Sequence, residues 1–156
     1  MPKRTKFVEN KYFTALRSET ASRGEHNDCT VKALAVAARI PYSEAHEALR
    51  RRGRRNRKGF YTYEIVKELD ERGFTVKKIN IERFMSEWYP RSLKHLQNIT
   101  LRHFVKFPSI FGEYRFLAKV KGHVAMYDGG NGLVDWSVNS SKRVTDLYMV
   151  LDVGDV

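Results

Sequence analysis

Cys29, the only cysteine in the sequence, is the residue best placed to do covalent chemistry. It follows Asn27 and Asp28, which are good helix N-cap residues, and it precedes apolar residues at helical spacing, Val31, Leu34, Ala35 and Ala38. We therefore expect Cys29 in the first turn of a helix, where unpaired backbone N–H groups and the helix dipole favour the thiolate. A thiolate that an imidazole also reaches is a nucleophile. Alternatively, Cys29 is a small buried hydrophobic residue, because free cysteine is often buried.

His123 and Asp135 are the candidate partners of this thiol. The segment Asp128-Gly129-Gly130-Asn131-Gly132 is a strong hairpin signal, and it separates a strand that His123 opens from the strand that carries Asp135. An antiparallel pair can bring two such residues together, so that Asp135 orients the imidazole while its other nitrogen faces the cysteine. Alternatively, His123 is a structural residue and Asp135 only bonds the backbone. Three residues of these types in this order favour the first interpretation.

Helices are expected in the first half of the chain. The first should begin at Cys29 and end near Ile40, because Pro41 disfavours helical geometry in the residue before it. A second is expected after Ser43 as its cap, with Gly53 past its end, and a third after Thr62, with Gly73 as its stop.

Strands dominate the second half. A short strand is expected over 74–81, and others over 115–120, 123–127, 133–137 and 147–151. Residues 82–107 give weaker signals, with Ser92 and Thr100 as candidate caps and a helix that should stop before Pro108. Helices followed by an antiparallel sheet indicate an α+β fold, with the N-terminal helices packed on a C-terminal sheet.

Length and composition limit the class of protein. We expect 156 residues to form one domain over 25–156, preceded by a basic, partly flexible N-terminal arm over 1–24. A single cysteine excludes an intramolecular disulfide and a cysteine zinc cage, and the histidines lack ligand spacing, so no metal is expected. No cofactor is expected either, because no glycine-rich phosphate loop precedes a helix. No apolar stretch approaches membrane-spanning length, which favours a soluble, cytoplasmic protein without a membrane partner.

Positive charge is the strongest compositional signal, with 29 Lys and Arg against 18 Asp and Glu, a net charge of +11 and a pI near 9.9. Seven of the ten residues 50–59 are basic, and this basic segment should be too self-repelling to fold over a core. It either docks a polyanion, such as nucleic acid, a ribosome or an acidic protein, or is a solvated loop whose positive charge stabilises the C-terminal end of a helix. Its candidate binding residues are Arg50, Arg51, Arg52, Arg54, Arg55, Arg57 and Lys58.

Several short motifs together resemble papain-like cysteine peptidases. They are Asn27-Asp28-Cys29, Gly122-His123-Val124 with Asp128-Gly129-Gly130, and Val134-Asp135-Trp136. They look like the small papain-like proteins common in bacteriophage and bacterial genomes, and the separation of His123 from Asp135 is similar to that in bacteriocin-leader-cleaving peptidases. The resemblance covers order and spacing between residues 27 and 137, without motifs in the middle of the chain.

The resemblance implies a papain-like fold and a Cys-His-Asp triad. Cys29 would be the nucleophile, His123 the general base and then acid, and Asp135 the group that orients the ring. The reaction would be acyl transfer through a thioester, normally hydrolysis of an amide, peptide or isopeptide bond in a protein or peptide substrate. Papain-like enzymes usually place a Gln several residues before the cysteine as an oxyanion donor, but residues 21–25 contain none. Asn27 is the nearest amide, and without such a donor the chain would be a weak enzyme or an inactive binding protein.

Overall fold

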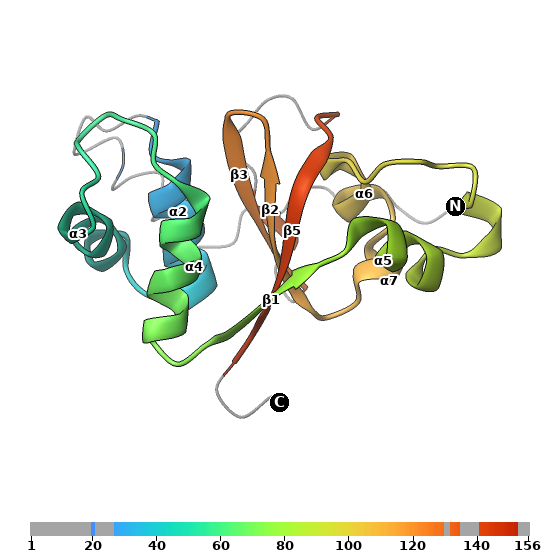
Figure 1. The fold of residues 1–156 in the computed structure, drawn as a ribbon, viewed down its shortest axis with the longest axis horizontal. Coiled ribbons are helices and arrows are strands. Elements are labelled where there is room, and N and C mark those ends of the chain that lie inside the picture. The colour runs from blue at the N-terminus through green and yellow to red at the C-terminus, as the bar shows by residue number, and fades with distance from the viewer. Residues whose placement is uncertain (1–19, 21–26, 130–131, 135–140, 153–156) are drawn as a thin grey trace.

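An antiparallel sheet with helices on both faces forms the fold in the computed structural model, which describes residue 20 and residues 27–129, 132–134 and 141–152. Figure 1 shows α2, α3 and α4 on one side of the sheet and α5, α6 and α7 on the other. The α+β class is therefore confirmed, and the N-terminal helices do pack on the sheet. The second helical layer is additional to what the sequence predicted. Of the N-terminal arm, only Thr20 belongs to the described residues.

The sheet consists of β1 (Thr75–Ile79), β2 (Arg115–Val120), β3 (His123–Asp128), β4 (Gly132–Val134) and β5 (Val144–Leu151). Its order is β1-β5-β2-β3-β4, and all neighbours are antiparallel. The four C-terminal strands were predicted, although the end of the predicted 133–137 strand lies outside the described residues. Ile81, assigned from sequence to the end of the first strand, instead begins α5.

The helix α2 (Cys29–Ala38) is the centre of the first helical layer, between β3 on one side and α3 (Tyr42–Arg51) and α4 (Thr62–Glu71) on the other. All its side chains after Cys29 are buried except Lys32, as expected for a helix that is apolar all round. It ends two residues earlier than predicted, because Arg39 adopts a left-handed conformation and its N–H bonds Ala35 and Val36.

The caps predicted for the next two helices are wrong by two residues and by one residue. Pro41 rather than Ser43 precedes α3, and Tyr61 rather than Thr62 precedes α4. Neither helix has a side-chain cap bond, so packing of its buried face fixes where it begins.

The second helical layer covers the other face of the sheet with α5 (Ile81–Trp88), the short 3₁₀ helix η1 (Arg91–Leu93), α6 (Leu101–Lys106) and α7 (Pro108–Phe111). Its core is aromatic, with Phe84, Phe104, Phe111, Phe116 and Tyr127 in mutual contact. Thr100 caps α6 as predicted. Ser92 does not act as a cap, since it lies inside η1, and Asn80 caps α5 by accepting a bond from the Arg83 N–H.

Within the described residues, no helix is long and apolar enough to cross a membrane.

Candidate active site

Cys29 is the first residue of α2, as the sequence predicted. The chain enters this helix through Asn27, whose left-handed φ of 54° asparagine tolerates better than most residues. Asp28 occupies the N-cap position but makes no side-chain cap bond. Its buried carboxylate instead accepts a hydrogen bond of 2.7 Å from the Tyr42 hydroxyl and lies 3.3 Å from Lys32 Nζ. The N-terminus of α2 is thereby fixed to α3.

The structure brings His123 to Cys29. His123 is the first residue of β3, directly after the turn at Gly122, and its side chain is hydrogen-bonded to the thiol. The backbone of Val124 makes a second hydrogen bond with the same sulfur. Because α2 packs along β3, one helix end and one strand end meet at this point.

The pKa of the Cys29 thiol reflects this environment. Burial of the partly exposed side chain raises its pKa, and the charge of Asp28 raises it slightly further. The hydrogen bonds from His123 and Val124, together with the charge of His123, lower the pKa by more. The net result is a pKa below that of an ordinary cysteine, so more of the thiol is present as the nucleophilic thiolate at neutral pH.

Cys29 and His123 open into a cavity of about 480 Å³. Its other lining residues come from α2, from the segment between α3 and α4, and from the β2–β3 hairpin: Thr30, Gly53, Arg55, Lys58, Gly59, Phe60, Tyr61, Thr62, Lys119, Gly122 and Val124. Arg55 and Lys58 were predicted as binding residues and Gly122 and Val124 belong to the His123 motif, but no sequence pattern predicted that they would line one cavity with Cys29. Thr30, Phe60, Tyr61 and Lys119 were not singled out from the sequence, because only the folded chain brings them close to residues 29 and 123.

The other two predicted catalytic residues are placed differently. The side-chain amide of Asn27 donates to the Arg57 carbonyl at 3.2 Å, and Asn27 does not line the cavity. It therefore fixes the basic segment next to the start of α2. Asp135 lies outside the described residues, which in β4 end at Val134, one residue before it.

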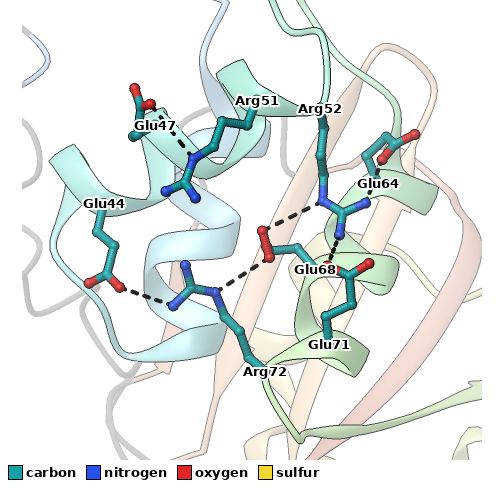
Figure 2. Close-up of polar contacts among 8 residues, drawn as sticks. All are labelled: Glu44, Glu47, Arg51, Arg52, Glu64, Glu68, Glu71 and Arg72. Atoms are coloured by element: carbon teal, nitrogen blue, oxygen red, sulfur yellow. Dashed lines mark hydrogen bonds and ion pairs between the residues drawn. The ribbon is translucent and has the colours of Figure 1, made fainter.

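The basic segment is not a uniformly solvated loop, which was one of the two interpretations that the sequence left open, and it is not held off the core by self-repulsion as expected. Arg50 and Arg51 form the last turn of α3 and pair with Glu47, while Arg52 pairs with Glu64, Glu68 and Glu71 of α4. Figure 2 shows how this network links the two helices. Arg54 is buried, with 4% of its surface exposed. Glutamates of α3 and α4 offset the repulsion that was expected to keep the segment off the core.

Among the described residues, no group of three His, Cys, Asp or Glu side chains could hold a metal ion. No protein-family model, curated protein or solved structure matches this chain.

Proposed function

We propose that this protein is a papain-like cysteine hydrolase that cleaves an amide, peptide or isopeptide bond of a protein or peptide substrate. The observation that carries the proposal is the hydrogen bond between the Cys29 thiol and the His123 imidazole, at a helix N-terminus beside a cavity. The resemblance to small phage and bacterial papain-like proteins supports the same fold family and a cytoplasmic place of action.

In the proposed first half-reaction, His123 accepts the thiol proton and Cys29 Sγ attacks the substrate carbonyl carbon. A C–S bond forms and the C–N bond breaks as His123 gives the proton to the leaving amine. In the second, His123 takes a proton from water, the resulting hydroxide attacks the thioester carbon, and the C–S bond breaks. The product leaves as a carboxylic acid and Cys29 is regenerated. An amine in place of water would give acyl transfer.

Two further groups complete the proposed mechanism. The backbone N–H of Cys29 has no intrahelical acceptor, since it is in the first turn, and it would donate to the developing oxyanion. Asp135 would orient the His123 ring, a role assigned from its sequence position. Asn27 would hold the segment that walls the cavity, because its amide bonds the Arg57 carbonyl.

Alkylation of Cys29 by iodoacetamide across pH tests the proposal. We expect rapid alkylation well below the ordinary thiol pKa of about 8.5, a large loss of reactivity at neutral pH in His123→Ala, and a smaller loss in Asp135→Asn. Cys29→Ala should fold normally and show no labelling. An unreactive thiol, or one indifferent to His123, would mean that Cys29 is structural.

A binding protein that docks a polyanion through the basic segment is the second candidate. One observation favours it: within the described part of the chain, Arg55 and Lys58 are exposed and neither forms an ion pair. Such binding would weaken steeply with salt and would be lost when these two residues become Ser. The pairing of Arg50, Arg51 and Arg52 with glutamates reduces the surface available for it.

A further inference from the structure

The cavity beside Cys29 has a one-sided charge. Three of its lining side chains are the cations Arg55, Lys58 and Lys119, and none of the lining residues that the structure describes is acidic. The cations come from two separate parts of the chain, because Lys119 lies on β2 whereas the others follow α3. The three cations therefore do not all belong to one solvated loop, and the fold brings them together at the cavity. The potential inside the cavity is therefore positive.

These three cations differ from the other arginines nearby in how they are paired. Arg51, Arg52 and Arg72 each meet at least one glutamate of α3 or α4, as Figure 2 shows. No acidic residue of the described chain forms an ion pair with Arg55, Lys58 or Lys119. Among the residues that the structure describes, glutamates thus neutralise the basic charges beside the cavity but give no counter-charge to those that line it. An anionic group of a bound molecule would supply it.

Glycines and an exposed aromatic side chain in the lining of the cavity favour a polypeptide ligand. Gly53, Gly59 and Gly122 line it, and a Cβ at any of the three would meet no atom within 4 Å, so their backbones are open to it. Tyr61, which is 61% exposed, adds an aromatic face stacked on Tyr63 at 5.1 Å. The buried Thr30 hydroxyl, which also belongs to a lining residue, has no hydrogen-bond partner among the described residues. Exposed backbone at these glycines leaves room for a peptide chain to approach the cavity wall.

We propose that this cavity binds an acidic segment of the polypeptide substrate, with Arg55, Lys58 and Lys119 pairing its Asp or Glu carboxylates next to the bond that Cys29 attacks. The inference rests on the proposed hydrolase function. A polypeptide is favoured over nucleic acid because the adjacent thiol reacts with acyl carbons, which a phosphodiester backbone does not offer.

The first test compares two alkylating agents of nearly equal size, anionic iodoacetate and neutral iodoacetamide. The ratio of their rates cancels the thiolate fraction, so it reports the local potential independently of whether His123 activates Cys29. We expect the ratio of the iodoacetate rate to the iodoacetamide rate to be higher for Cys29 than for free cysteine. This ratio should fall about tenfold in Arg55→Gln/Lys58→Gln, and it should also fall on addition of salt. Arg50→Gln/Arg51→Gln is the matched control, because it removes the same charge from residues that do not line the cavity. Equal effects of the two double variants would overturn the proposal.

The second test measures binding of fluorescently labelled peptides to Cys29→Ser, and so does not depend on catalysis. A Glu-Gly repeat peptide should bind at least about tenfold more tightly than its Gln-Gly counterpart at low salt. Arg55→Gln/Lys58→Gln should remove this preference and the control double variant should keep it. Gly59→Val should weaken binding without changing charge, because its side chain would project into open space. Unaltered binding in Gly59→Val, or preference for a single-stranded oligonucleotide through the same cations, would overturn the proposal.

Discussion

Asp28 links the stability of the protein to the reactivity of its thiol. Its carboxylate is 3% exposed, accepts from the hydroxyls of Tyr42 and Thr20, and pairs with Lys32. The same charge lies next to Cys29 and raises the thiol pKa, against the larger effect of His123. The Asp28 carboxylate therefore fixes the start of α2 and also opposes the lowering of the Cys29 pKa.

Asp28→Asn separates these two effects. The amide can still accept from Tyr42, but the negative charge that opposes the thiolate is removed, so the pKa of Cys29 should fall further. The ion pair of Lys32 with residue 28 is lost, and the free energy of unfolding should fall by about 1–3 kcal/mol. Iodoacetamide pH profiles and chemical denaturation measure the two quantities. Tyr42→Phe is the control, since it removes the hydrogen bond and keeps the charge. A profile that moves to higher pH in Asp28→Asn would contradict this account.

At the scale of elements, the helix α6 depends on a neutral histidine. The Thr100 N–H can only donate, and it lies 3.5 Å from His103 Nδ1, so this nitrogen acts as an acceptor. It also accepts from the Tyr89 hydroxyl at 2.9 Å, and burial raises the pKa of Tyr89, which keeps that hydroxyl protonated. Burial, and then the charge of Lys106, lower the pKa of His103. The folded state therefore holds the ring neutral.

Stability should consequently fall on mild acidification. Because the pKa of His103 is lower in the folded than in the unfolded protein, its contribution is complete above the unfolded value of about 6.5. It is lost as the pH falls towards the folded value, with a slope of at most about 1.4 kcal/mol per pH unit. His103→Gln keeps the capping box without a titrating ring and should reduce this slope in denaturation experiments between pH 7 and 5. The exposed His95 gives the control, His95→Gln, which should leave the slope unchanged. Equal slopes in wild type and His103→Gln would contradict the prediction.

The elements that the sequence predicted well are those with local signals. The helix at Cys29, the cap at Thr100 and the strands after residue 115 follow from cap residues and apolar spacing. In the second helical layer, α6 was predicted, but α7 was missed because it has only four residues and is held by aromatic packing rather than by periodicity. The buried Arg54 and the paired Arg52 were missed because their partners are distant in sequence.

The candidate site was also predicted only in part, because some of its residues come together only in the folded chain. Order along the chain identified Cys29 and His123, which the structure brings together. Strand alternation alone would place His123 on the face of Ala125 and Tyr127, away from α2. His123 is the first residue of its strand, after a turn, and there the ring is able to reach the thiol. Lys119 and Thr30 carry no sequence signal, and nothing in the sequence places them with Gly53, Gly59 and Gly122, because only the folded chain brings these residues to one cavity.

At the scale of the whole molecule, Arg115 connects the helix that carries Cys29 to the sheet. It lies at the start of β2 and is 6% exposed. Its guanidinium donates to the carbonyls of Val36 and Ala37, in the last turn of α2, at 2.8 and 2.6 Å. It also bonds Asp152, just beyond β5, at 3.2 Å. A single side chain thus binds the C-terminal end of α2, whose other end presents the thiol, and gives the Val36 and Ala37 carbonyls a hydrogen-bond donor at the end of the helix.

Arg115→Met should destabilise this protein. Methionine fills a similar volume, but it removes the buried guanidinium that donates to the Val36 and Ala37 carbonyls and to Asp152. The Val36 carbonyl and Asp152 keep a donor in Arg39, whereas the Ala37 carbonyl loses its side-chain donor, and we expect a cost of about 1–3 kcal/mol. Arg39→Met is the matched control, because Arg39 pairs with the same carboxylate at 2.7 Å from an exposed position, and such a pair contributes less than about 1 kcal/mol. Chemical denaturation of both variants measures the difference. Arg115→Met removes the hydrogen bonds that hold the C-terminal end of α2, so amide hydrogen exchange should become faster in residues 29–38. Arg39→Met should leave this exchange unchanged. A small, equal cost in the two variants would mean that Arg115 does not hold the helix to the sheet.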